Sequence, residues 1–167
     1  MANNGAVGLR AGQGRPGRGD ALVAAQLVLL GALLLPAEGT SSPARRVAGA
    51  ALLAAGGGSA LLGAIALGPA LTPSPLPVPG APLRTTGPYG WVRHPIYAGL
   101  TVAAIGRALG TGAPRHRAAA AALTVLLRLK ARYEERELAD AVPQYATYAA
   151  RTPAWWPRRG GAHRCGR

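Results

Sequence analysis

Two long apolar stretches of this chain are separated by a run of polar and aromatic groups at residues 87–99, Gly-Pro-Tyr-Gly-Trp-Val-Arg-His-Pro-Ile-Tyr-Ala-Gly. The flanking stretches consist mainly of Ala, Leu, Val and Gly, and their length favours membrane helices. A cation and an imidazole are costly to keep beside a bilayer core, so Arg93 and His94 indicate a functional site.

The charge and the apolar content together favour a membrane surface as the partner. The 167 residues carry a formal charge of +13, nearly all from arginine, since Lys130 is the only lysine. Such basicity is typical of chains that bind nucleic acid or an anionic membrane. The sequence shows no basic helix or aromatic-basic platform for nucleic acid, so we expect none to bind. Cys165 is the only cysteine, which excludes an internal disulfide and a cysteine-based zinc site, and we expect no metal.

The apolar pattern predicts an all-α, polytopic membrane protein with about four transmembrane helices in one domain, residues 20–157. Residues 1–19 and 158–167 are expected to be disordered basic tails. The first helix also resembles a signal peptide, but the apolar helices after it favour a retained span. The expected helices cover residues 21–35, 47–71, 95–109 and 117–140, followed by a short helix that contains Tyr145 and Tyr148.

Three local features add detail to this predicted helical pattern. Alternating prolines predict an extended connector at residues 72–80. Gly56, Gly57, Gly58, Ser59 and Gly63 give the second helix a small-residue face suited to close helix packing. Trp155 and Trp156 resemble an interfacial anchor.

The third and fourth expected helices form a hairpin that turns at residues 110–114. A hairpin brings the start of its first helix beside the end of its second. We therefore expect His94 and Tyr97 near Lys130 and Glu134, which share a helix face at a spacing of four. Alone, each cluster is equally well explained as a snorkelling loop or a solvated helix end. Together they predict a site with both charge signs at a membrane surface.

The distribution of arginines predicts an orientation. With four spans and a cytoplasmic N-terminus, the cytoplasmic side carries more basic residues than the other side, as the positive-inside rule requires. Heavy use of Ala, Gly and Arg is typical of a GC-rich bacterial genome. We expect both termini and both polar clusters at the cytoplasmic face of a bacterial membrane.

The order of motifs over residues 70–157 resembles the isoprenylcysteine carboxyl methyltransferase family, which is related to the phospholipid methyltransferases. The resemblance rests on the Arg-His-Pro-Ile-Tyr-Ala-Gly run at 93–99 and on Glu-Glu-Arg-Glu-Leu at 134–138. Thr86-Gly87-Pro88-Tyr89, Tyr145-Ala146-Thr147-Tyr148 and Pro157 add to it. It implies an integral membrane enzyme that uses S-adenosylmethionine and carries its cofactor site on the C-terminal helical hairpin.

The resemblance also implies roles for individual residues. The family's substrate arginine corresponds to Lys130, which keeps the charge but loses the bidentate fork. Lys130 is expected to hold an anionic substrate head, and Arg93 the substrate or a lipid phosphate; we expect these two to be the catalytic residues. The implied cofactor contacts are Leu83, Arg84, Tyr89, His94, Pro95, Ile96, Tyr97 and Glu134.

The function that the resemblance implies is methyl transfer to a lipophilic acceptor, either an isoprenylcysteine carboxylate-like group or a lipid. A carboxylate or thiolate acceptor needs no general base, whereas an amine must lose a proton, for which His94 is the nearest base. The alternative enzyme is an NADPH-dependent membrane reductase of the sterol-reductase type, which has a similar C-terminal hairpin. A non-catalytic membrane scaffold is the third hypothesis.

Overall fold

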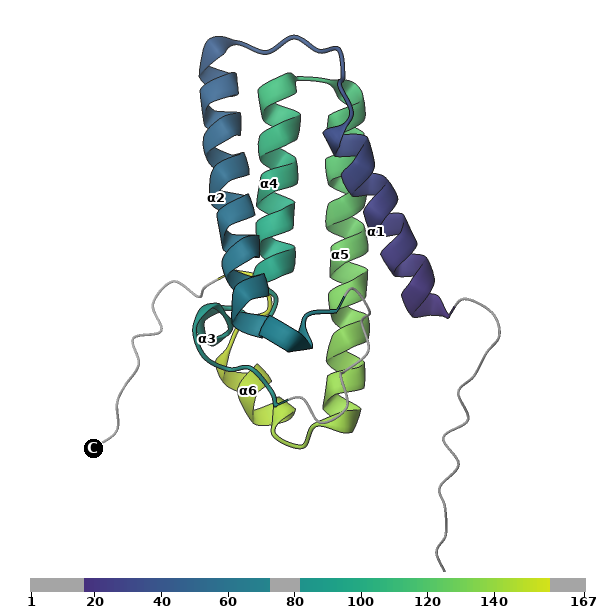
Figure 1. The fold of residues 1–167 in the computed structure, drawn as a ribbon, viewed down its shortest axis with the longest axis vertical. Helices are drawn as coiled ribbons and strands as arrows, with labels where there is room; N and C mark the ends of the chain where they lie inside the picture. Colours follow the sequence, from purple (N-terminus) through teal and green to yellow (C-terminus); the bar gives the residue numbers. More distant parts are fainter. Residues whose placement is uncertain (1–16, 73–81, 157–167) are drawn as a thin grey trace, which may run out of the picture.

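The computed structural model describes residues 17–72 and 82–156, and within these ranges it contains helices, turns and loops but no strand. The prediction of an all-α fold is therefore confirmed. Three long helices, α2 (Pro43–Leu67), α4 (Pro95–Thr111) and α5 (Pro114–Ala141), stand in a row, and α1 (Arg18–Leu34) crosses α5 obliquely (Figure 1). The short elements η1 (Gly68–Ala70), α3 (Pro88–Trp91) and α6 (Tyr145–Arg151) gather at one end of this row.

Proline and glycine set the boundaries of the predicted hairpin. Helix α4 begins at Pro95 as predicted, since proline is well suited to the first helical turn. Its last residue is Thr111, and Gly112 follows with a left-handed φ of 67°. Helix α5 then begins at Pro114, so the connection is only Gly112 and Ala113, shorter than the predicted turn at 110–114. Pro143 lies just past the end of α5.

The other boundaries differ modestly from the predicted ones. Helix α1 begins at Arg18, inside the segment assigned to the N-terminal tail. Helix α2 begins at Pro43 because Ser42 caps it, accepting a hydrogen bond of 3.4 Å from the backbone of Arg45. The single turn α3 was not predicted. The proline connector at 73–80 and most of both expected tails lie outside the described residues.

Helices α2 and α4 pack antiparallel, with their backbones almost in contact. A Cβ atom placed on Gly49 would lie 2.6 Å from the carbonyl oxygen of Gly106. One placed on Gly99 would lie 2.6 Å from the carbonyl oxygen of Gly56. Real Cβ atoms do not approach this closely, so the interface requires glycine at these positions.

The small-residue face predicted for the second helix is confirmed only in part. Gly56 and Gly63 lie against α4, and both are buried. Gly57 and Gly58 would meet nothing within 4 Å if they carried a Cβ, and Ser59 is exposed. The helix turns 100° per residue, so consecutive small residues cannot share one face.

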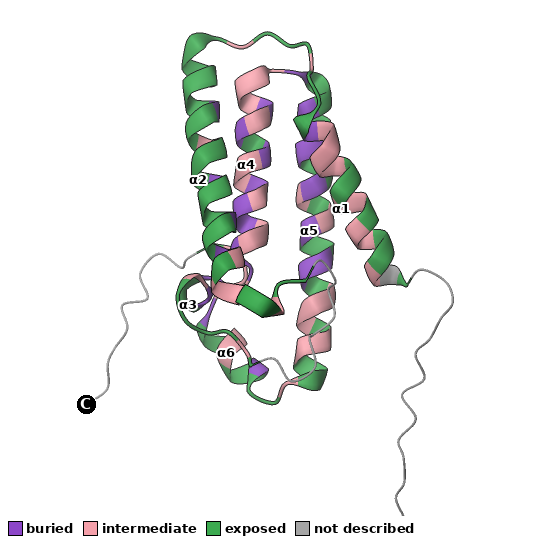
Figure 2. Cartoon of the chain, in the orientation of Figure 1, coloured by how far each residue is buried: buried purple, intermediate pink, exposed green. Residues whose placement is uncertain are grey.

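Large apolar side chains are exposed on α1 and α2. Figure 2 shows the buried residues concentrated on α4 and α5, whereas α2 is mostly exposed. Among the described helices, Pro43–Ala70 alone is long and apolar enough to cross a membrane, and Gly19–Leu34 is a shorter apolar helix. The four-span topology thus remains a prediction.

Polar side chains from α4 and α5 cap the C-terminal end of α1. Arg107 Nε donates to the carbonyl of Leu33 at 3.0 Å. The fully buried His116 has Nε2 at 3.1 Å from the carbonyl of Leu35 and Nδ1 at 2.9 Å from the Thr111 hydroxyl. These bonds satisfy carbonyls that a helix end leaves without partners. His116 therefore has a structural role, which sequence analysis did not single out.

The glycine packing leads to a paired prediction. Gly56→Ala should lower the free energy of unfolding by about 1–3 kcal/mol, because its Cβ would collide with the backbone nitrogen of Ala103. Gly57→Ala should leave stability unchanged or raise it by about 0.5–1 kcal/mol, because alanine favours an exposed helix. Thermal unfolding of the two variants in detergent, followed by circular dichroism, compares them. Equal losses of stability would contradict the packing described above.

Candidate active site

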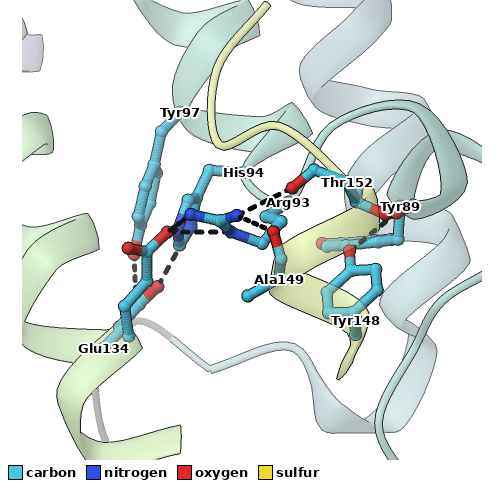
Figure 3. Close-up of polar contacts among 9 residues, drawn as sticks. Tyr89, Arg93, His94, Tyr97, Glu134, Tyr148, Ala149 and Thr152 are labelled. Carbon is cyan, nitrogen blue, oxygen red and sulfur yellow. Dashed lines mark hydrogen bonds and ion pairs between the residues drawn. The ribbon is translucent and has the colours of Figure 1, made fainter. Parts of the chain in front are cut away.

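The hairpin brings the start of α4 beside the charged C-terminal part of α5, as predicted. The Tyr97 hydroxyl donates a short hydrogen bond to the Glu134 carboxylate (Figure 3). His94 Nε2 lies 3.0 Å from Glu135 Oε1, and His94 Nδ1 lies 3.6 Å from Glu134 Oε2. The expected convergence of His94 and Tyr97 with the acidic residues of α5 is therefore confirmed.

The pKa values of the two neighbouring carboxylates, Glu134 and Glu135, are shifted in opposite directions. Hydrogen bonds from His94 and Arg93 lower the pKa of Glu135 to about 2, against the opposing effect of burial. Burial raises the pKa of Glu134 above its ordinary value, although the hydrogen bond from Tyr97 opposes that rise. Glu135 therefore belongs to a structural ion pair, while Glu134 is a partly buried hydrogen-bond acceptor whose charge is only partly balanced.

Arg93 clamps the C-terminal segment onto α5. Its Nε and Nη2 donate to Glu135 Oε1 at 3.0 and 2.8 Å, and its Nη1 donates to the carbonyls of Ala149 and Thr152 at 2.9 and 2.7 Å. The backbone N–H groups of Arg93 and His94 add bonds of 2.9 and 3.0 Å to residues 153 and 154. Four of the five guanidinium N–H groups are engaged in this way. These contacts give Arg93 a positioning role, and contact with the substrate remains a prediction.

Three aromatic rings cover the site. The rings of His94 and Tyr97 stack with centroids 5.5 Å apart and planes 6° from parallel. The Trp155 ring lies 6.3 Å from His94 and 6.4 Å from Tyr97, and it packs against the apolar core. Trp155 is therefore a member of this cluster, whereas Trp156 is exposed, and the interfacial anchor stays a prediction for both. The contact between Trp155 and His94 could not be predicted from the spacing of the two residues in the sequence.

Lys130 lies deep in the bundle beside this cluster. Its side chain is 1% exposed, its Nζ donates to Gln26 Oε1 at 2.8 Å, and it lies 5.4 Å from the centre of the Tyr97 ring. Burial lowers the pKa of Lys130, and the nearby charge of Glu134 opposes this effect. Sequence analysis missed Gln26, although it is the one polar side chain between residues 21 and 35.

The remaining predicted cofactor contacts are spread around this cluster. Tyr89 is buried, its carbonyl accepts a bond of 2.6 Å from the Tyr148 hydroxyl, and burial with the charge of Glu134 raises the pKa of Tyr89 to about 12. Pro95 and Ile96 lie beside Gly63 of α2. Leu83 is half-buried and Arg84 exposed on the segment that leads to α3, and within the described residues neither forms a hydrogen bond or ion pair with the cluster. No group of three His, Cys, Asp or Glu side chains suited to a metal occurs in the part of the chain that the structure describes.

The Glu135 contacts predict a change in the pH dependence of stability. Because the folded-state pKa of about 2 lies below the ordinary 4.5, this stabilisation is complete above about pH 4.5 and is lost as the pH falls towards 2. Glu135→Gln should lower the free energy of unfolding by about 1–3 kcal/mol at pH 7 and flatten its fall over this range. Denaturant titrations at several pH values measure both effects. The exposed Asp140→Asn is the control, and a Glu135→Gln curve parallel to wild type would contradict the assignment.

Comparison with known proteins identifies the family. A family model described as phospholipid methyltransferase matches residues 44–142, which contain nearly all of α2 and all of α4 and α5. The cobalt-zinc-cadmium resistance protein CzcN of Cupriavidus metallidurans is 41% identical over 81 residues, which span 46% of this chain and 36% of that protein. No solved structure matches the chain. Since the match covers more than half of the sequence, this chain belongs to the phospholipid methyltransferase family.

Proposed function

We propose that this chain is an S-adenosylmethionine-dependent methyltransferase that acts on a lipophilic acceptor at a membrane face. Its family consists of methyltransferases of lipid-like substrates, which supports the reaction class. The observation that carries the proposal is the convergence of a partly buried carboxylate, Glu134, with the aromatic rings of Tyr97 and Trp155 and the cation of Lys130.

The side chains of the site are chemically suited to this cofactor. S-adenosylmethionine carries a sulfonium cation, an ammonium group and an aromatic adenine, so it needs an anion and flat apolar surfaces. Glu134 offers the anion, and the Tyr97 and Trp155 rings offer the surfaces. We propose that Glu134, His94, Tyr97 and Tyr89 hold it, and that Leu83, Arg84, Pro95 and Ile96 line its surroundings. When bound, it supplies an electrophilic methyl group.

The chain's own contribution is positioning. The Tyr97 hydroxyl orients the Glu134 carboxylate, and stacking on His94 holds the Tyr97 ring. The Arg93–Glu135 clamp in turn holds His94, because both residues share the same carboxylate oxygen of Glu135. Well-oriented reactants reach effective molarities of about 10⁵ M or more, so a rigid frame of this kind accounts for much of the rate enhancement that such a reaction needs.

The charges around the site favour an acceptor with an anionic group. Lys130 supplies a cation at the bundle interior, where it would hold a carboxylate or phosphate of the acceptor. Both ring nitrogens of His94 face carboxylate oxygens, Nε2 at 3.0 Å from Glu135 and Nδ1 at 3.6 Å from Glu134, so neither nitrogen is turned towards an acceptor amine. This arrangement supports an acceptor that needs no proton removal, such as an isoprenylcysteine carboxylate-like group, over an amine.

We also propose that the bundle is integral to a bacterial cytoplasmic membrane. The family is membrane-associated, and the apolar segment Pro43–Ala70 is long enough to span. Large apolar side chains are exposed on α1 and α2, among them Leu27, Val28, Leu61 and Ile65. The apolar parts of α4 and α5 would complete four spans, and the distribution of arginines supports a cytoplasmic site and cytoplasmic termini.

The first prediction from this proposal concerns Glu134. Membranes that contain wild-type chain should transfer methyl from labelled S-adenosylmethionine into lipid-extractable material. Glu134→Gln should weaken binding of S-adenosylmethionine by about tenfold to a hundredfold, because one hydrogen-bonded charge is lost. Calorimetry on purified protein measures the binding, with Asp140→Asn as a control for an equal change of charge on the same helix.

The outcomes separate the hypotheses. Unchanged binding by Glu134→Gln would remove this carboxylate from the cofactor site. Neither transfer nor binding by the wild-type chain would contradict the proposed function. Binding of NADPH in its place would favour the reductase.

The second prediction concerns Lys130. Lys130→Met keeps the volume of the side chain but removes its charge, so it should raise the apparent KM for acceptor in a total lipid extract of the expressing cells by about tenfold or more. Binding of S-adenosylmethionine should survive. Arg128→Gln removes an exposed cation from the same helix and is the control. Loss of cofactor binding in Lys130→Met alone would contradict the assignment of Lys130 to the acceptor.

A further inference from the structure

Helix α1 contributes one polar side chain to the interior of the bundle. Gln26 is half-buried in an otherwise apolar stretch, residues 21–35. A primary amide in such surroundings is unfavourable unless it is hydrogen-bonded. Its oxygen accepts a bond of 2.8 Å from Lys130 Nζ, across 104 residues of sequence. Helix α1 lies wholly outside residues 44–142, so the family match assigns nothing to this residue.

Gln26 ends a chain of contacts that crosses three helices. From α1 its amide oxygen meets the Lys130 ammonium of α5, which lies over the Tyr97 ring of α4. The Tyr97 hydroxyl then donates to Glu134. Since Lys130 is 1% exposed, the protein must supply most of the solvation that its charge loses on burial.

We propose that Gln26 is a positioning residue of this site, whose amide oxygen fixes the Lys130 ammonium beside Tyr97 and keeps it charged for an anionic acceptor. The contact itself is independent of the reaction, whereas the part played by the acceptor rests on the proposed function. Among the described residues, the charged or titratable groups that face Lys130 include Glu134 on α5 and Tyr97 on α4, and α1 contributes the neutral amide of Gln26.

The chain offers a direct test because Lys130 is its only lysine. Labelling with ¹³Cε-lysine gives one side-chain NMR signal, whose change with pH in the full chain in detergent reports the protonation of Lys130. Gln26→Leu removes this amide oxygen from the surroundings of Lys130 and should lower the titration midpoint by about one pH unit or more. Gln26→Glu replaces it with a carboxylate and should raise the midpoint above that of wild type.

Two further variants complete the test. Gln26→Asn shortens the side chain by one methylene group and so moves the amide oxygen away from Lys130. It should lower the titration midpoint, as Gln26→Leu does, and it keeps the test decisive if the leucine variant does not fold. Leu27→Gln places an amide on the exposed neighbouring position and should leave the midpoint unchanged. Midpoints that do not move in the Gln26 variants, or that move in the same direction for Gln26→Leu and Gln26→Glu, would overturn the proposal.

The same variants test the link to the acceptor. The alkaline limb of the pH profile of kcat/KM, measured with labelled S-adenosylmethionine and total lipid extract, should move with the NMR midpoint, while kcat at saturating acceptor stays near wild type. A limb that stays in place while the midpoint moves would overturn the positioning role. A wild-type chain that transfers no methyl group would contradict the proposed function, and the Lys130 titration would still decide whether Gln26 controls the charge.

Discussion

The ion pair between Arg93 and Glu135 joins three parts of the chain that lie far apart in sequence. Arg93 precedes α4, Glu135 lies on α5, and the remaining guanidinium donors reach the carbonyls of Ala149 and Thr152 in the C-terminal segment. The same carboxylate oxygen, Glu135 Oε1, also lies 3.0 Å from His94 Nε2. Because the charge-assisted bonds of the Arg93 guanidinium are directional, they hold the start of α4, the C-terminal part of α5 and the segment that carries Trp155 in one geometry. The stacked rings and the Tyr97–Glu134 bond both depend on it.

The two adjacent glutamates, Glu134 and Glu135, have different roles in the site. Hydrogen bonds with His94 and Arg93 keep Glu135 ionised far below neutral pH, so its role is structural. Glu134 is more desolvated and contacts a hydroxyl and the edge of an imidazole, so it retains capacity to meet a cationic ligand. Neighbouring residues on a helix point about 100° apart, and this rotation alone sends the two side chains into different surroundings. The sequence singled out Glu134 by its spacing from Lys130, but it gave no structural role to Glu135.

The bundle that carries this site is held together by different means on its two sides. Between α2 and α4 the helices approach through glycines such as Gly56 and Gly99, where packing and not polar bonding makes the contact. Helix α1 is attached by apolar packing and by polar bonds from Lys130 to Gln26 at its middle and from Arg107 and His116 to the carbonyls at its C-terminal end. This leaves α2 with an apolar outer face, which suits a lipid environment.

Local sequence alone determined the helices, the hairpin and hence the meeting of His94 and Tyr97 with Glu134, because periodicity, Pro95 and a short glycine turn dictate which segments run antiparallel. The clamp by Arg93, the insertion of Trp155 and the Gln26–Lys130 bond were decided only by tertiary structure. These contacts join residues that are 42 and 104 positions apart, for Arg93–Glu135 and Gln26–Lys130, or that meet across separate elements. Their partners depend on how the helices rotate and pack against one another, and no local pattern of residues encodes that rotation.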